Sequence, residues 1–517
     1  PRYSDECTPI QDVTPVFDEF VRVECTSEGT EVYRDFHGFV RAQRRPRRRR
    51  GLSVLLLGAD NLSRLNMVRS MPRTLAALQR LGAVNMLGYN KVDDYSYVNL
   101  VPLLSGQPSR EMERRCLLDN SVFFDPCPWL WKRFARQGYT TALMEDAARL
   151  GLFHFHSPGF ARKPVDVDSR PLLLAAEREL PRSRARAGNT SPVCLGPRFQ
   201  IQGLFDFALK FVRAMVQTRT PFFQYAWGTS LTHDYLNQAQ IADPVYERFL
   251  EELEETGVLN TTALVFLSDH GNRVGPIVST YQGHVEDRLP VLSFVLPPWM
   301  HRRYPVAVAN LRHNVRRLVT VMDVHETVAQ LTDLASLEEP RLRAAAEDLR
   351  GRVLAGTPPR AVSLFLPVPD TRTCEQAGVV PHFCACVHLT PVATDHPSVV
   401  QAARLLVDNI NAALAPHPLC ARLGLRAVRD ARRGEPSSLL GQRQPPDRVR
   451  EQEFLITVQT TPGDALLAGT VRHLVAENVM RLAGRVTRLN KYGNTSWCAP
   501  ERALMLYCFC TEPPGVT

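Results

Sequence analysis

The sequence has no apolar run long enough to cross a bilayer. Its longest candidates, residues 53–59 and 291–298, fall well short of the ~18 residues that a spanning helix needs. It also has no internal repeat, and its 44% hydrophobic and 22% charged residues are ordinary for a globular chain. These features argue against a membrane-spanning bundle, a repeat array and a disordered or fibrous protein.

Net positive charge is small outside one short segment. The chain of 517 residues has a formal net charge of +9, and seven arginines lie between Arg41 and Arg50, so removing those seven leaves +2 for the rest. Such a run can bind polyanions such as nucleic acid, heparin-like glycans or anionic lipid. No nucleic-acid-binding module or interleaved aromatic residue accompanies it. It therefore predicts a solvated or protease-sensitive linker, with polyanion contact as the alternative and no specific nucleic-acid partner.

Cysteine is sparse in the first two thirds of the chain, which hold five residues, and dense after residue 370, where seven of the twelve lie. Cys384 with Cys386 and Cys508 with Cys510 each enclose one residue, whereas a zinc knuckle encloses two to four. This spacing favours disulfides over a zinc site. Disulfides in turn indicate an oxidising compartment.

Glycosylation sequons agree with such a compartment. Asn189, Asn260 and Asn494 begin acceptor motifs, while a fourth sequon at Asn61 follows a candidate metal ligand and is expected to be inaccessible. We therefore expect an extracellular glycoprotein or one in the lumen of the secretory pathway. Because the chain begins with Pro1, an anchor on a segment N-terminal to it is compatible with this expectation.

Short apolar strands alternate with helices from residue 51 to about residue 350. This alternation predicts an α/β fold with a mostly parallel central sheet covered by helices on both faces. We expect an N-terminal segment with a basic linker (1–50), a catalytic domain (51–360) and a smaller cysteine-rich α+β region (361–517). Strands are predicted at residues 53–59, 139–144, 221–227, 262–267, 291–296, 454–460 and 503–510, and helices at 71–82, 131–138, 205–216, 244–256, 325–334 and 338–350.

Polar side chains follow several of these strands. Ligands gather outside the carboxyl ends of strands in open α/β sheets, so these side chains are expected to meet at one edge. Two carboxylates, an imidazole and a serine hydroxyl would bind a divalent cation and hold a serine alkoxide against it. The candidates at strand ends or in the loops after strands are Asp60, Ser96, His233 with Asp234, and Asp269 with His270.

The segments around these residues resemble the alkaline phosphatase superfamily, which includes sulfatases, nucleotide phosphodiesterases and phosphoethanolamine or glycerol-phosphate transferases. Within it, the chain is most similar to the animal sulfatase-like family called domain of unknown function 229. The resemblance implies an alkaline phosphatase/sulfatase-like fold. It is carried, in the family's order, by residues 57–66, 71–74, 88–92, 99–106, 230–237, 268–271, 282–290 and 384–386.

The resemblance implies roles for individual residues. Asp60, Asp269 and His270 would be metal ligands, together with Ser96, which stands at the position of the nucleophile. His233 matches a histidine that contacts metal or substrate. His284 stands where sulfatases have a lysine that contacts the transferred anionic group, and Asn99 matches a substrate-binding asparagine.

Two departures narrow the chemistry. Thr229 stands where dinuclear phosphodiesterases carry an aspartate, which favours a site for one ion over a site for two. Ser96 lacks the proline and arginine that formylglycine formation requires, so Ser96 is expected to act directly. The oxygen-rich donor set with one imidazole favours zinc, with manganese or calcium as alternatives.

These observations predict a metal-dependent hydrolase or transferase that acts through a serine nucleophile on phosphate esters, with sulfate esters as the second substrate class. The substrate would be a phosphorylated or sulfated small molecule, lipid or glycan. The alternative is a catalytically inactive extracellular member of the family that binds glycan or protein. The arginine run, His284 in place of lysine and the absent second-site aspartate support this alternative.

Overall fold

The computed structural model of the 517-residue chain describes residue 4 and residues 7–41, 51–117, 123–155, 157–184, 190–436, 451–491, 493–499 and 502–511. Residues 42–50 of the predicted basic run Arg41–Arg50 and the sequon residue Asn189 lie outside these ranges. The chain forms two compact units. The first comprises residues 1–89, 95–271 and 290–368, and the second comprises residues 90–94, 272–289 and 369–517.

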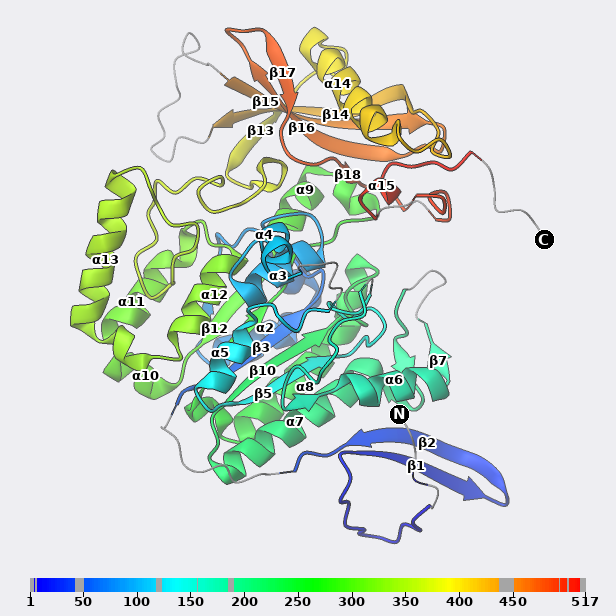
Figure 1. Ribbon diagram of the computed structural model, residues 1–517, viewed down its shortest axis with the longest axis vertical. Helices are drawn as coiled ribbons and strands as arrows, with labels where there is room; N and C mark the ends of the chain where they lie inside the picture. The colour runs from blue at the N-terminus through cyan, green and yellow to red at the C-terminus, as the bar shows by residue number, and fades with distance from the viewer. Residues whose placement is uncertain are drawn as a thin grey trace. The chain divides into compact units, whose positions relative to one another are not determined.

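A seven-stranded sheet forms the centre of the first unit, in the order β4-β12-β11-β3-β10-β5-β6 (Figure 1). Strands β11, β3, β10, β5 and β6 run parallel to their neighbours in this order, while β12 is antiparallel to both β11 and β4. The predicted, mostly parallel α/β sheet is therefore confirmed, with an antiparallel edge. The strands are β3 (Ser53–Ala59), β4 (Val84–Asn85), β5 (Thr140–Glu145), β6 (Val167–Asp168), β10 (Phe222–Gly228), β11 (Thr262–Leu267) and β12 (Leu292–Val295).

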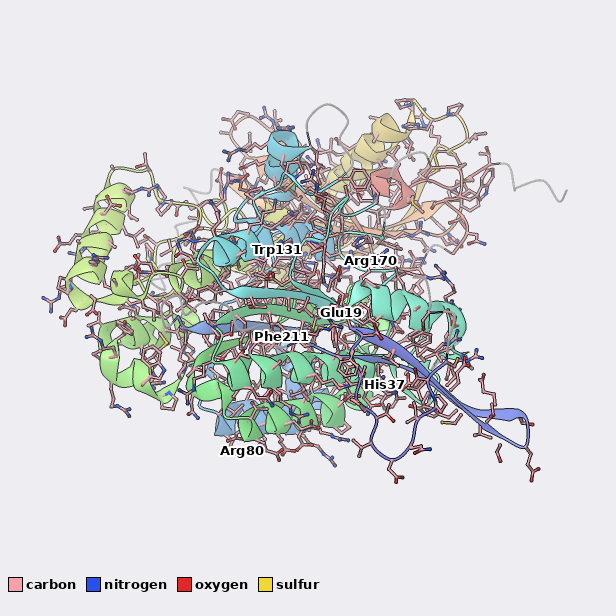
Figure 2. The ribbon with its side chains drawn as sticks, turned by 60° about the horizontal axis from the view of Figure 1, so that its bottom comes forward. Glu19, His37, Arg80, Trp131, Arg170 and Phe211 are labelled. Carbon is pink, nitrogen blue, oxygen red and sulfur yellow. A yellow bond between two sulfur atoms is a disulfide. The ribbon has the colours of Figure 1, made fainter. Side chains whose placement is uncertain are left out.

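Helices cover both faces of this sheet, because its central strands carry apolar side chains on both sides. Every residue of β3, β10 and β11 is buried. Helices α2, α7 and α8 pack together on one face, and α3, α5 and α12 pack together on the other. Figure 2 shows Trp131 of α5 and Phe211 of α7 on opposite sides of the strands. These helices are α2 (Pro72–Arg80), α3 (Ser96–Ser105), α5 (Leu130–Arg136), α7 (Gln200–Thr218), α8 (Ala239–Glu255) and α12 (Val321–Gln330).

Shorter elements complete the first unit. The antiparallel hairpin β1 (Phe20–Ser27) and β2 (Thr30–Gly38) contributes Phe36 to the core beneath α7. A small sheet contains β7 (Arg182–Ser183), β8 (Cys194–Leu195) and β9 (Arg198–Phe199). The remaining helices are α1 (Arg64–Ser70), α4 (Ser109–Cys116), α6 (Arg170–Glu179), α10 (Pro298–Arg303), α11 (Pro305–His313) and α13 (Glu339–Leu354). No helix in the described part of the chain is both long and apolar enough to cross a membrane.

The second unit is an antiparallel sheet packed against one long helix, α14 (Pro397–Leu414). The sheet order is β13-β14-β15-β16-β17, with β18 beside β16. The unit also contains helix α9 (Tyr281–Arg288). Its strands are β13 (Val387–Pro391), β14 (Gly424–Pro436), β15 (Glu451–Thr461), β16 (Leu466–Leu474), β17 (Val479–Leu482) and β18 (Thr487–Arg488).

The predicted disulfides are present. One joins Cys116 to Cys127 in the first unit, and three lie in the second unit: Cys374–Cys384, Cys420–Cys508 and Cys498–Cys510. The strand predicted at residues 503–510 is wrong, because this segment forms the short helix α15 (Arg502–Met505) followed by a turn. The two disulfides that fix Cys508 and Cys510 override the local preference for a strand.

Candidate metal centre

Two neighbouring strands deliver the predicted ligands to one edge of the sheet. Asp60 directly follows β3, and Asp269 and His270 follow β11. The two strands are parallel and in register, with Leu267 opposite Gly58, so their carboxyl ends coincide. Asp60, Asp269 and His270 are all buried, and each offers one ligand atom within 4.8 Å of the others. The structure therefore brings together residues that are about 200 positions apart in the sequence.

Hydrogen bonding fixes the state of the His270 ring. Its Nδ1 lies 2.9 Å from the backbone carbonyl oxygen of Gly271. Because a carbonyl can only accept, Nδ1 carries a proton, and in the neutral ring Nε2 then keeps its lone pair. Nε2 is the atom that faces the carboxylates. This is the tautomer that a metal-binding histidine needs.

The residues present fit a divalent metal ion. Asp269 Oδ2 is buried, accepts no hydrogen bond from the residues that the structure describes, and lies 3.1 Å from His270 Nε2. With the ring neutral, these two acceptor atoms repel one another, and a cation bound by both removes the repulsion. Two carboxylates and an imidazole are ligands that divalent metal ions commonly take in proteins.

Asn61 connects three of the segments around this cluster. Its backbone adopts a φ of +62°, in the left-handed region that asparagine tolerates better than most residues. In this conformation its N–H donates to Asp269 Oδ1 at 3.2 Å, and its side-chain amide donates to the carbonyl oxygens of Thr232 and His233 at 3.1 and 2.9 Å. Asn61 is 5% exposed, so its sequon is inaccessible, as predicted.

Ser96 is the first residue of helix α3, which corrects the prediction that it lies in a loop after a strand. Its Oγ lies 3.2 Å from His270 Nε2. Backbone N–H groups in the first turn of a helix have no intrahelical partner and point toward any anion bound there. The helix ends at Gly106, whose φ of +73° provides a left-handed cap. The position predicted for the nucleophile therefore places a hydroxyl at the start of a helix.

His233 lies in the loop that follows β10. Its Nδ1 is 3.2 Å from Asp234 Oδ1 and 3.2 Å from Thr190 Oγ1. Asp234 also accepts hydrogen bonds from the hydroxyl and the backbone N–H of Thr190. Burial raises the pKa of the Asp234 carboxyl, but the hydrogen bonds from His233 and Thr190 outweigh burial and hold that pKa below its usual value. Asp234 therefore fixes the His233 ring through Nδ1.

A second buried carboxylate holds the start of this loop. Asp146 follows β5 and accepts hydrogen bonds from Thr229 N, Ser230 N and Ser230 Oγ at 2.7, 3.0 and 2.6 Å. The sequence analysis gave Asp146 no role, although its place after a buried strand is the signal that identified Asp60. Thr229 stands at the position of the missing second-site aspartate, and its backbone N–H is hydrogen-bonded to Asp146.

The two predicted substrate-binding residues lie in different surroundings. Asn99 is buried in α3, and its side-chain amide donates to the carbonyl oxygen of Tyr95 at 3.1 Å. His284 belongs to α9 in the second unit. Burial, and next the charge of Arg288, lower the pKa of His284 well below its ordinary value, so this imidazole is neutral at neutral pH.

Comparisons with known proteins point to one family. The model of a family described as "Protein of unknown function (DUF229)" matches residues 5–429. A search of curated proteins finds no match.

Several solved structures are similar to this chain. A protein of the alkaline phosphatase superfamily from Vibrio parahaemolyticus shares 11% identity over 84% of this chain and 83% of its own, with a TM-score of 0.38. The C-terminal periplasmic domain of EcEptC from Escherichia coli shares 13% identity over 57% and 87%, with a TM-score of 0.39. The PsFucS1 sulfatase from Pseudoalteromonas sp. shares 14% over 55% and 68%, with a TM-score of 0.34.

Proposed function

The chain belongs to the DUF229 family, and from this premise we propose that it is a metal-dependent hydrolase or transferase of phosphate esters, with sulfate esters as the second substrate class. The observation that carries the proposal is the position of Ser96. Its hydroxyl lies 3.2 Å from His270 Nε2, in a cluster of buried ligands and at the first turn of a helix.

Asp60, Asp269 and His270 would hold the ion, with Ser96 Oγ as a further ligand. A bound divalent ion supplies Lewis-acid stabilisation of the charge that develops on the ester and on Ser96. Zinc suits this donor set, with manganese and calcium as the alternatives. Thr229, which stands in place of the second-site aspartate of dinuclear relatives, supports a site for one ion.

Ser96, its hydroxyl proton released to water, would attack the phosphorus or sulfur atom in line with the leaving oxygen. The bond from Oγ to that atom forms while the bond to the leaving group breaks, and the N–H groups at the start of α3 stabilise the equatorial oxygens. His233, oriented by Asp234, would protonate the leaving oxygen. Water or an acceptor alcohol, giving its proton to His233, then displaces Ser96 from the phosphorus or sulfur atom, which gives hydrolysis or transfer respectively.

The substrate class we propose is a phosphorylated or sulfated small molecule, lipid or glycan. The four disulfides support an extracellular or lumenal location for the reaction. Exposed sequon asparagines at Asn260 and Asn494 are compatible with glycosylation there.

Two variants test this function. Ser96→Ala removes the nucleophile and Asp269→Asn removes a ligand, so each should lower turnover of p-nitrophenyl phosphate, bis-p-nitrophenyl phosphate and p-nitrophenyl sulfate by about 100-fold or more. Asp269→Asn should also lose the metal in elemental analysis, whereas Ser96→Ala should retain most of it. Asp206→Asn, on an exposed position of α7, is the matched control and should behave like the parent.

Turnover by the two variants at the parental rate would contradict this mechanism. A parent protein that carries no stoichiometric metal and turns over none of the three esters would instead favour a binding role. Comparison of phosphate and sulfate release decides between the two substrate classes.

A further inference from the structure

A pocket in the second unit lies between α9 and the antiparallel sheet. It is lined by Arg273, Arg288, Arg432 and Arg488, together with Asp94, Asp287 and Asp430. The segments that contribute these residues are distant in sequence, so only the folded unit assembles the pocket. We refer to it as the arginine pocket.

Cations outnumber anions in and around the arginine pocket. Arg273 pairs with Asp94 at 3.1 Å, and Arg432 pairs with Asp430 at 2.9 Å. Asp287 is shared between Arg288 at 3.3 Å and the fully buried Lys91 at 2.6 Å. Arg488 adds a further charge, so the four lining arginines and the buried Lys91 outnumber the three carboxylates. Low-dielectric walls concentrate this positive potential.

The deepest guanidinium is fixed in place. Arg288 is 3% exposed and donates to the carbonyl oxygens of His382 and His284 at 2.6 and 2.8 Å. Burial lowers the pKa of Arg288 to about 10, so the group remains charged at neutral pH. These carbonyl oxygens and Asp287 take most of its N–H groups, so Arg288 contributes positive charge to the pocket and leaves the direct contact to another arginine.

The histidines in the pocket wall leave its charge unchanged. Burial, and then the charge of Arg288, lower the pKa of both His284 and His382 well below the ordinary value. His382 is held between Thr470 Oγ1 at 2.9 Å and Thr487 Oγ1 at 3.2 Å. These rings therefore contribute neutral polar surface, and the arginines supply the charge.

The mouth of the arginine pocket is lined by an aromatic ring and hydroxyl side chains. Tyr281 is 39% exposed, and the Arg432 guanidinium lies 4.8 Å from its ring centre. The His284 ring is nearly parallel to that of Tyr281, with the ring centres 6.3 Å apart. Ser279 and Thr280 are exposed beside this aromatic face, with the Thr280 hydroxyl donating to the carbonyl oxygen of Ile277. A flat ring beside hydroxyls and a guanidinium suits a ligand that is part polyol and part anion.

We propose that the arginine pocket binds a sugar that carries a sulfate or phosphate ester, with the ester group at Arg432 and the sugar at Tyr281. The proposal stands on the residues of the second unit and does not require the reaction at Ser96. Arginine recognises both tetrahedral oxyanions through paired N–H donors, so the two esters share one recognition chemistry.

The test measures binding to the whole chain carrying Ser96→Ala, in the presence of EDTA, by isothermal titration calorimetry. The probes are glucose 6-sulfate, glucose 6-phosphate and uncharged glucose. We expect at least one of the two esters to bind, with glucose binding at least tenfold more weakly. The tighter ester identifies the natural anion. Chelation and the serine substitution keep this result separate from the outcome of the proposed reaction.

Variants of the pocket make the test specific. Arg432→Gln and Tyr281→Ala should each weaken ester binding at least tenfold. Asp430→Asn should tighten it severalfold, because it removes the carboxylate that competes for Arg432, and a merely structural role would not produce this gain. Arg429→Gln is the matched control, since Arg429 is an exposed arginine on the same strand that pairs with Gln459.

Absence of ester binding by the parent would overturn the proposal. Ester binding that is unchanged in both Arg432→Gln and Tyr281→Ala would also overturn it, because the ester would then bind elsewhere. Tyr281 is exposed at the mouth, so Tyr281→Ala keeps the test decisive even if Arg432→Gln unfolds the strand.

Discussion

Glu145 ends strand β5, and at the scale of single residues its ionisation is linked to stability. Burial raises the pKa of Glu145 to about 7 from its ordinary 4.5. The folded chain therefore retains a proton that the unfolded chain releases between pH 4.5 and pH 7. The free energy of unfolding should fall as the pH rises through this window, and the full cost applies above pH 7.

Glu145→Gln should remove this dependence. The substitution keeps an oxygen to accept the hydrogen bond from Leu152 N, now 2.8 Å from Glu145 Oε1. Urea unfolding should show the variant more stable than the parent by up to about 3 kcal/mol at pH 8, with little difference at pH 5. Glu255→Gln, at an exposed position of α8, serves as the control. An equal gain at both pH values would rule out this explanation.

At the scale of elements, the loop after β10 depends on the end of β5. Asp146→Ala would leave Thr229 N and Ser230 N buried without their acceptor, which should cost about 2–5 kcal/mol of stability. Because this loop carries His233, we also expect kcat to fall at least tenfold while the metal content stays near the parental level.

A matched carboxylate separates positioning from stability in this experiment. Asp243 is also buried and accepts hydrogen bonds from Arg73 N, Thr74 N and Thr74 Oγ1, where it fixes the start of α2. Asp243→Ala should cost a similar free energy of unfolding without lowering kcat in the folded fraction. If both variants reduce kcat equally, Asp146 has no special role in positioning His233.

At the scale of the whole molecule, the two units have separate cores and different stabilising elements. The candidate metal ligands lie in the first unit, while three of the four disulfides lie in the second. Domains with their own cores can unfold independently. Chelator and reductant should therefore act on different parts of the chain.

Removal of the metal should destabilise the first unit selectively. An ion present at about 100 times its Kd contributes roughly 2.7 kcal/mol, so EDTA should raise hydrogen exchange in β3, β11 and α3 and leave β15 and β16 unchanged. Asp269→Asn should not respond to EDTA. Protection in β3 and β11 that is identical with and without chelator would contradict a metal at Asp60, Asp269 and His270.

The sequence predicted the central strands well because their signal is local. Apolar runs such as Thr262–Leu267 agree with the observed strand at both ends. The direction of β12 was not readable from the sequence, because an antiparallel edge strand has the same apolar pattern as a parallel one. The helix at residues 502–505 was also missed, and the cysteines that follow it are bonded to Cys420 and Cys498.

The sequence by itself determined the α/β class, the family and the residues at the ends of β3 and β11, because hydrophobic periodicity and short motifs act over a few neighbouring positions. Only the tertiary structure decided that Ser96 begins a helix 3.2 Å from His270 Nε2, a contact between residues 174 positions apart. It also decided that Asn61 and Asp146 hold the surrounding loops and that scattered arginines meet in one pocket. These features depend on chain segments packing against one another, and no local pattern in the sequence encodes such distances.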